Sequence, residues 1–265
     1  MNGAKIGAIV EREIADARKN KMILLSMALI PTLLVAMVLG TAFVMLNMGA
    51  EDQASLDEDE LNMIPAELAN LDPLHAFLIL LNDQFMFYFL LIPMMLPVYI
   101  AAYSIVGEKE TRSLEPLLAT PVSTGELLVG KSLAAVLPAV ALTWLSFVVL
   151  ITGGLLIMPR PVFLAMIRPV WLIGMLLLSP LLAMLSVLSG VIVSSRINDP
   201  RAAQQVTGIF VVPIIALSLV VLAGKVFLSV WMVLPGAAIV LLLDSLVLYF
   251  AVKLFQRETI LTRWK

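Results

Sequence analysis

The sequence predicts an all-α polytopic membrane protein with six transmembrane helices and both termini in the cytoplasm. Of its 265 residues, 61% are hydrophobic and only 14% are charged, whereas a soluble domain carries about a quarter charged residues. The apolar residues form runs of about 20, long enough to cross a bilayer as helices. Basic residues gather in alternate connecting segments, as they do in the cytoplasmic loops of membrane proteins. We therefore expect residues 1–265 to form one transmembrane domain.

The composition also limits the chemistry that the chain can perform. It has no Cys, which excludes disulfides, thiol catalysis and cysteine metal sites. Its one histidine, His75, cannot form a histidine metal cluster alone. We therefore expect no cofactor and no metal on this chain, and no nucleic-acid partner.

The N-terminal residues 4–21 are predicted to form an amphipathic helix. Ile6, Val10 and Ile14 recur every four residues and line one helical face, while charged residues fill the rest. Such a helix lies in the membrane interface, here on the inner leaflet. The alternative is a frayed, solvated tail.

Six apolar runs follow, and each is interpreted as a membrane span. The first run is too long for a secretory signal, and no small-residue cleavage site follows it. The break between the fifth and sixth runs is short, and we interpret Gly224-Lys225 as the turn between them. The predicted spans are residues 22–46, 85–106, 133–157, 170–194, 206–223 and 231–252.

Every span contains proline, which removes a backbone hydrogen bond and tends to kink a helix. Neighbouring helices can compensate for this loss in a membrane. Pro93 and Pro97 lie close together, which makes the second span a candidate moving element; a static kink is the alternative. The span prolines are Pro31, Pro93, Pro97, Pro138, Pro180, Pro213 and Pro235.

The charges of the connecting segments predict the orientation. Of the 17 Lys and Arg residues, 14 fall on one side, which is therefore cytoplasmic. The loop at residues 47–84, on the other side, has nine acidic residues and no basic one. We interpret it as a solvated extracytoplasmic loop rather than a cation site, because the consecutive acids Asp57–Glu60 point in different directions. This pattern, without a targeting segment, fits a prokaryotic plasma membrane.

Two acids lie near or within the spans. Asp83 is expected at the outer boundary, where it and Asn82 would cap the second span. Asp244 lies well inside the sixth span, where a carboxylate is costly and is a functional candidate. Asp244, Pro93 and Pro97 are therefore candidates for a translocation path; alternatively, Asp244 is protonated or hydrogen-bonds to a neighbouring helix. An intramembrane enzyme acting through Asp83 or Asp244 is a further alternative, although no second catalytic group converges with them.

One segment imitates a nucleotide-binding loop. Gly125 to Ser132 matches the P-loop pattern letter for letter. A P-loop follows a strand and wraps phosphates with a flexible, glycine-rich turn. Here the spacer is bulky and leads straight into a span, so we expect no ATP binding by this chain.

The most informative segment is the cytoplasmic loop at residues 107–131, between the second and third spans. After a charged block, Leu114, Leu117 and Leu118 follow at helical spacing, and Thr120-Pro121 stops the helix. A short helix with an apolar stripe suits docking into a groove on a partner. The alternative is a helix that lies on the membrane surface.

This loop resembles that of type-2 ABC transporter permeases, the membrane subunits of a large exporter family. Arg112 and Pro116 depart from the pattern, since many members have Gly and Gln there. The tail at residues 254–261 also resembles the ending of the family. The matching residues of the loop are Glu108-Lys109-Glu110, Ser113-Leu114-Glu115, Leu117–Val122 and Gly130-Lys131.

The resemblance implies a membrane transport subunit that is not itself an enzyme. Two such subunits, identical or related and surrounded by membrane lipid, would form the path of an exported substrate. Two ATP-binding subunits, carrying ATP and Mg, would dock below. Residues 107–121 would be the coupling helix that transmits ATP-driven closure to the spans. The implied coupling residues are Glu108, Lys109, Glu110, Arg112, Leu114, Glu115, Leu117, Leu118 and Pro121.

Two questions stay open at this point. The family is associated with sodium ions, drugs, peptides, lipids and polysaccharides, so the resemblance does not predict the substrate. The alternative function is a membrane scaffold or sensor that recruits a cytoplasmic partner through the same loop and transports nothing.

Overall fold

The computed structural model describes residues 2–19, 21–48, 64–110, 123–196, 200–223 and 228–254. Every regular element within these ranges is a helix, which confirms the predicted all-α class. In chain order the elements are α1 (Gly3–Lys19), α2 (Lys21–Leu46), η1 (Ala66–Leu68), α5 (Pro73–Glu110), α7 (Thr124–Ile157), α8 (Arg160–Met166), α9 (Pro169–Ile173), η2 (Gly174–Leu178), α10 (Ser179–Arg196), α11 (Pro200–Thr207), η3 (Gly208–Val211), α12 (Val212–Leu222) and α13 (Val230–Leu254).

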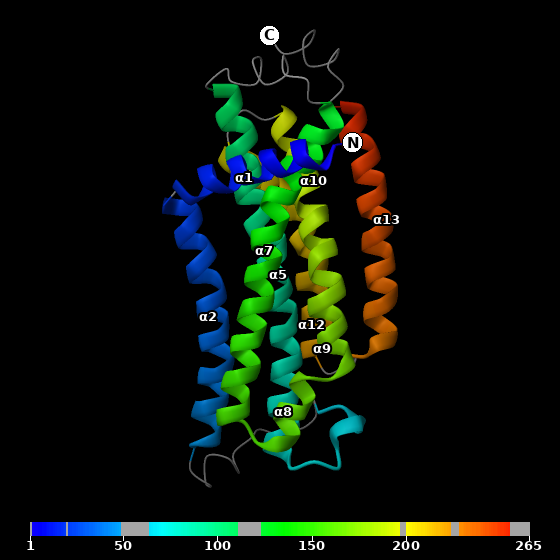
Figure 1. Cartoon of the computed structure of the whole chain (residues 1–265). Coiled ribbons are helices and arrows are strands. Elements are labelled where there is room, and N and C mark those ends of the chain that lie inside the picture. Colours follow the sequence, from blue (N-terminus) through cyan, green and yellow to red (C-terminus); the bar gives the residue numbers. More distant parts are fainter. Residues whose placement is uncertain are drawn as a thin grey trace.

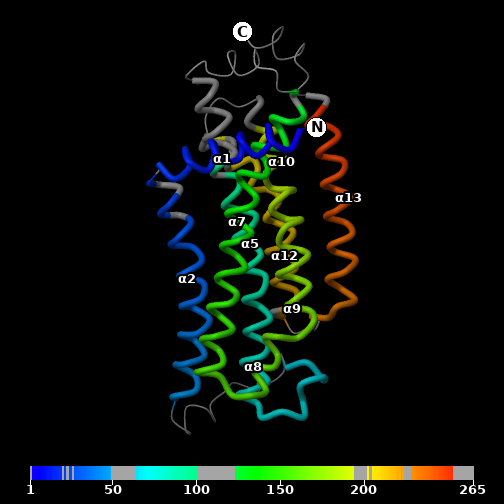
Figure 2. The backbone as a smooth tube through the Cα atoms, in the orientation of Figure 1, coloured from blue at the N-terminus to red at the C-terminus, as the bar shows by residue number. Residues whose placement is uncertain are grey.

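The long helices lie side by side along a common axis, and α1 crosses them at one end (Figure 1 and Figure 2). We call this end the α1 end. The last turns of α5 and α13 and the first turns of α7 also lie there, whereas α8 and η1 lie at the opposite end, called the α8 end. The amphipathic helix expected at the N-terminus is therefore present and packs across the bundle.

Five helical stretches in the described residues are long and apolar enough to cross a membrane. A multi-pass membrane protein is thereby confirmed. The stretch expected as the fifth span is divided among α11, a 3-10 turn (η3) and α12, and its apolar part, Gln205–Val221, is shorter than the others. The count of six spans therefore stays a prediction. The five stretches are Met27–Leu46, Pro73–Val98, Gly125–Ile157, Arg160–Val193 and Val230–Val252.

Two helices start earlier than the apolar runs predict. α5 begins at Pro73, so residues 73–84 are helical, and the expected start at residue 85 lies inside the helix. Proline suits the first helical position, and Asp72 Oδ1 accepts a hydrogen bond from Leu74 N at 3.0 Å. α7 likewise begins at Thr124, within the expected cytoplasmic loop. In both cases polar residues continue the helix beyond the apolar run on which the prediction depends.

The fourth apolar stretch, predicted as a span at residues 170–194 in which Pro180 tends to cause a kink, contains a π-helical turn just before that proline. After α8 and α9, the turn at η2 is π-helical and leads into α10. Pro180 lacks the N–H that would continue the π pattern onto the carbonyl of Met175. That carbonyl instead accepts hydrogen bonds from Ser179 Oγ and from Trp144 Nε1, the latter at 2.8 Å. Side chains thus replace the missing backbone donor.

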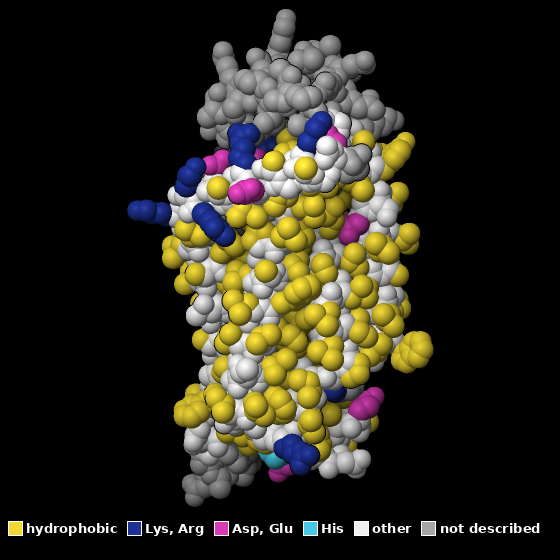
Figure 3. Space-filling view, viewed as in Figure 1, with side chains coloured by type: hydrophobic (Ala, Val, Ile, Leu, Met, Phe, Trp, Pro, Cys, Tyr) yellow, Lys and Arg dark blue, Asp and Glu magenta, His cyan; other side chains and the backbone are white. Residues whose placement is uncertain are grey.

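Helices α5 and α10 form the centre of the bundle, and α10 packs against α5, α7 and α13. The buried share is 78% for the α5 span, against 22% for the α2 span and 17% for the α13 span. Figure 3 shows apolar side chains around the middle of the molecule, with most of the visible charged side chains toward its two ends. α2 and α13 therefore leave most of their apolar side chains at least partly exposed, as helices that face lipid do.

The orientation can be tested because the chain has no Cys. Ser55→Cys should react with a membrane-impermeant maleimide in intact cells, since the basic-residue pattern predicts that the acidic loop lies outside. Ser113→Cys should react only after the membrane is permeabilised. The cysteine-free parent is the control for background labelling. Labelling of Ser113→Cys in intact cells would reverse the orientation.

Candidate functional site: the two ends of the coupling segment

The sequence predicts that residues 107–121, here called the coupling segment, contact a cytoplasmic partner. α5 continues to Glu110, so Glu108, Lys109 and Glu110 belong to its last turn. The structure therefore shows the two supports of the coupling segment, which are the end of α5 and the start of α7. The remaining predicted contact residues lie outside the described residues; they are Arg112, Leu114, Glu115, Leu117, Leu118 and Pro121.

A capping box starts α7 immediately after the coupling segment. Glu126 N donates to Ser123 Oγ at 3.2 Å, and Ser123 N donates to Glu126 Oε2 at 2.9 Å. This reciprocal pairing satisfies two free donors at the helix start. Glu126 Oε1 also accepts a hydrogen bond from Asn2 N at 2.7 Å. One carboxylate thus joins the start of α7 to the N-terminal end of α1.

α1 docks across the first turns of α7. Lys131 Nζ lies 2.7 Å from Glu13 Oε1, and the two side chains are only 9% and 10% exposed. Gly130 faces Ile9, whose Cγ2 would lie 2.8 Å from a Cβ at residue 130. A larger residue at 130 would therefore push the two helices apart. The Gly130-Lys131 pair of the sequence motif is thus the docking point of α1.

The same geometry explains why the P-loop pattern at Gly125–Ser132 has no phosphate-wrapping turn. All eight residues lie within α7, which begins at Thr124. From Leu127 onward, where Leu127 N donates to Ser123 O at 3.0 Å, the backbone N–H groups bond to carbonyls of the preceding helical turn rather than pointing at a ligand. The lysine of the pattern, Lys131, pairs with Glu13 instead.

α1 also carries an exposed ion pair. Lys19 Nζ lies 2.8 Å from Asp16 Oδ1, and the side chains are 77% and 56% exposed. The hydrogen bond from Lys19 lowers the pKa of Asp16. Pairs this exposed contribute little to stability because water screens them. The Lys131–Glu13 and Lys19–Asp16 pairs thus differ in burial while their distances are similar.

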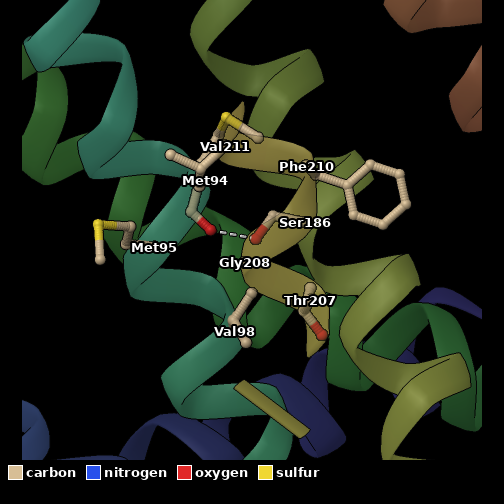
Figure 4. A pocket seen from close by; sticks show the side chains of 8 residues that line it. All are labelled: Met94, Met95, Val98, Ser186, Thr207, Gly208, Phe210 and Val211. Carbon is tan, nitrogen blue, oxygen red and sulfur yellow. Dashed lines mark hydrogen bonds between the residues drawn. The ribbon is translucent and has the colours of Figure 1, made fainter. Parts of the chain in front are cut away.

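Pro93 and Pro97 are buried in the interior of α5. Between them, the carbonyl of Met94 accepts a hydrogen bond from Ser186 Oγ of α10 (Figure 4). A cavity of about 60 Å³ lies beside this contact, far below the roughly 300 Å³ or more of a small-molecule pocket. This cavity therefore does not define a substrate site. It is lined by Met94, Met95, Val98, Ser186, Thr207, Gly208, Phe210 and Val211.

Asp244 lies on the buried face of α13, in line with Ala237 and Ala251. It is 7% exposed, and neither carboxylate oxygen has a hydrogen-bond partner among the described residues. α13 packs mainly against α10, α9 and the π turn, and it contributes no residue to the cavity beside Pro93 and Pro97. The three candidate path residues therefore do not share a cavity within the described part of the chain.

Asp83 lies inside α5 and does not cap it, contrary to the expectation from the sequence. Arg168 Nη2 lies 2.6 Å from both carboxylate oxygens, and Trp171 Nε1 donates to Oδ1 at 3.1 Å. The Asp83 side chain is 1% exposed and that of Arg168 is 25% exposed. Trp171 also stacks on Phe147, with ring centroids 5.8 Å apart. This cluster joins α5, α7 and the α8–α9 junction, which favours a structural role for Asp83 over a catalytic one.

Comparison with known proteins decides the family. A family model described as "ABC-2 family transporter protein" matches residues 7–252, from within α1 to the last turns of α13. The chain belongs to the ABC-2 transporter family. The resemblance to type-2 ABC transporter permeases is thereby confirmed. No curated protein gives a significant match.

Membership of the ABC-2 family has direct consequences for function. The chain is a membrane transport component, and the family implies an ABC transporter that includes an ATP-binding partner. Components of this kind are generally not catalytic themselves. The coupling segment is the part of the ABC-2 chain where the sequence predicts that this partner docks.

Several contacts of this ABC-2 chain are not anticipated from its sequence. Glu126 belongs to a readable capping-box pattern. Glu13 lies between Val10 and Ala17 on the face of α1 that packs inward, and an acid in that position signals a buried partner. No sequence pattern around Arg168 indicates a buried partner, and Asp83 lies 85 positions earlier in the chain.

Asp83→Asn should lower the stability of this ABC-2 protein by on the order of 3 kcal/mol, because loss of one partner leaves the other buried charge unpaired. We expect the lower end of the usual range, since the Arg168 side chain is 25% exposed. Thermal unfolding in detergent measures the effect. Glu67→Gln, at an exposed acid of η1, is the control and should not change the midpoint. Equal midpoints for Asp83→Asn and the parent would contradict the stabilising role.

Proposed function

We propose that the chain is the permease subunit of an ABC exporter in the plasma membrane. Two ATP-binding subunits hydrolyse ATP at the α1 end, and a second permease subunit, identical or related, completes the path. The observation that carries this proposal is the family match over residues 7–252. The exposed apolar sides of α2 and α13 offer surfaces for the second permease and for lipid.

The distribution of charge supports a cytoplasmic position for the α1 end and both termini. The basic residues of α1 and Lys131 of α7 lie at this end. Basic residues near the spans concentrate on the cytoplasmic side of a membrane. At the α8 end, by contrast, the described basic residues are Arg160, which is exposed, and Arg168, which is paired with the buried Asp83. The coupling segment is thereby on the side of the membrane where ATP is present.

A continuous helix supports the transmission of movement from the coupling segment to the outer side. α5 runs from Pro73 at the α8 end to Glu110, where the coupling segment continues. An ATP-binding subunit that moves the segment therefore moves the end of α5 directly. Pro93 and Pro97 give α5 a bend point between its two ends.

Leu117→Asp tests this proposal most directly. A carboxylate in an apolar docking groove costs several kcal/mol, so we expect binding of the ATP-binding subunit and ATP-dependent transport to fall by on the order of a hundredfold. Membrane insertion should be unchanged, because residue 117 lies outside the predicted spans. Co-purification of the ATP-binding subunit and the amount of chain in the membrane fraction are measured together.

The partner itself can be identified with a single cysteine. Leu117→Cys in this cysteine-free chain is crosslinked in its native membrane and purified by a tag. A stoichiometric ATPase joined at residue 117 supports the transporter function. A different protein joined there, with no ATPase, favours the scaffold or sensor function. Normal ATP-dependent transport by Leu117→Asp would show that the coupling segment does not couple.

A further inference from the structure

We propose that α1 is a positioning element for the coupling segment, held to the start of α7 by three contacts that we call the α1 clasp. The clasp consists of the Glu126–Asn2 hydrogen bond, the Gly130–Ile9 contact and the Lys131–Glu13 ion pair. This inference rests on the proposed function, because it assigns the clasp a role in ATP-driven coupling. With the clasp closed, α1 and the first turns of α7 move as one body.

The position of the clasp supports this role. Its α7 residues are Glu126, Gly130 and Lys131, in the first turns of the helix that follows the coupling segment. Glu126 uses one carboxylate oxygen to cap α7 and the other to hold the backbone of Asn2. The N-terminal end of α1 and the C-terminal support of the coupling segment therefore depend on the same side chain. A displacement of one displaces the other.

The burial of the ion pair supports a fixed position for α1. Glu13 and Lys131 are 9–10% exposed, and separating such a pair leaves two buried charges without compensation. A helix that lies on the lipid surface without protein contacts would keep these charged groups in water. The Lys19–Asp16 pair on the same helix has that exposed character. α1 is therefore attached to protein along one face and open to its surroundings along the other.

The connection to α2 gives the clasp a mechanical consequence. α1 ends at Lys19 and α2 begins at Lys21, so a single residue separates them. A movement of the coupling segment that carries α7 and α1 is thus transmitted to the start of the first span. The coupling segment then acts on α2 through the clasp, in addition to α5 and α7, to which it is covalently joined.

The experiment uses the complex of the full chain with the ATP-binding subunit identified by crosslinking at residue 117. Glu13→Gln should leave the Kd for that subunit unchanged and lower the kcat of ATP hydrolysis by the complex by roughly tenfold, which corresponds to about 1.4 kcal/mol in activation free energy. The charge exchange Glu13→Lys with Lys131→Glu should restore much of the rate. Asp16→Asn, which removes the exposed pair of the same helix, is the matched control and should behave as the parent.

A second measurement does not depend on the charged residues. Gly130→Ala adds a Cβ that would lie 2.8 Å from Ile9 Cγ2, so it should push α1 away from α7 and lower the kcat of ATP hydrolysis by the complex. Gly125→Ala, in the same part of α7 but with no atom within 4 Å of the added Cβ, is the matched control and should behave as the parent. ATP hydrolysis by Gly130→Ala at the parent rate would overturn the proposal.

The outcomes separate the clasp from the proposed function. If Leu117→Asp abolishes binding of the ATP-binding subunit while Glu13→Gln hydrolyses ATP at the parent rate, the clasp has no coupling role and the proposed function stands. If Leu117→Asp has no effect, the proposed function fails. A Glu13→Gln defect that the charge exchange does not rescue would indicate loss of fold rather than loss of coupling, and would also overturn the clasp.

Discussion

Every backbone N–H and C=O group within a bilayer needs a partner inside the protein, since lipid offers none. Proline removes such partners, and it occurs inside α2, α5, α7 and α13. At Pro180 of α10 the structure compensates with hydroxyl and indole donors, since Ser179 and Trp144 reach the carbonyl of Met175. Ser186 of α10 donates a further side-chain hydrogen bond to the carbonyl of Met94 in α5. The bonds from Trp144 and Ser186 cross from one helix to another, so they also fix the position of the neighbouring helix.

Buried charges likewise need partners inside the protein. Within the described residues, Asp83 and Arg168 pair at the α8 end, and Glu13 and Lys131 pair at the α1 end. Each pair joins elements that are distant in the sequence, and each lies at an end of the bundle rather than in its middle. Asp244 is different, because its carboxylate has no hydrogen-bond partner in the described part of the chain. It lies on the buried face of α13, the helix that packs mainly against α10.

Sequence reasoning predicts the helical class, most of the spans and the family, because apolar runs and one motif carry these signals locally. It does not predict where helices begin, since the start of α5 depends on Asp72 and Pro73 and that of α7 on a capping box. It also does not predict the π-helical turn at η2. This turn precedes Pro180, and the side chains of Ser179 and Trp144 donate hydrogen bonds to the carbonyl of Met175 there. The pairing of Glu13 with Lys131 and of Asp83 with Arg168 depends on tertiary structure. The coupling residues Arg112 to Pro121 and the orientation stay predictions.

The separation of Glu13 and Lys131 also bears on how the protein is made. The two residues are 118 positions apart in the chain. Translation at about 5–20 residues per second therefore leaves Glu13 without Lys131 for roughly ten seconds. During that interval the nascent N-terminal helix has only the membrane surface as a support, with its charged side chains in water or at lipid headgroups. The binding site for α1 is complete only when the third long helix has been synthesised and inserted. The first helix to leave the ribosome therefore depends for its final position on a helix that is made more than a hundred residues later.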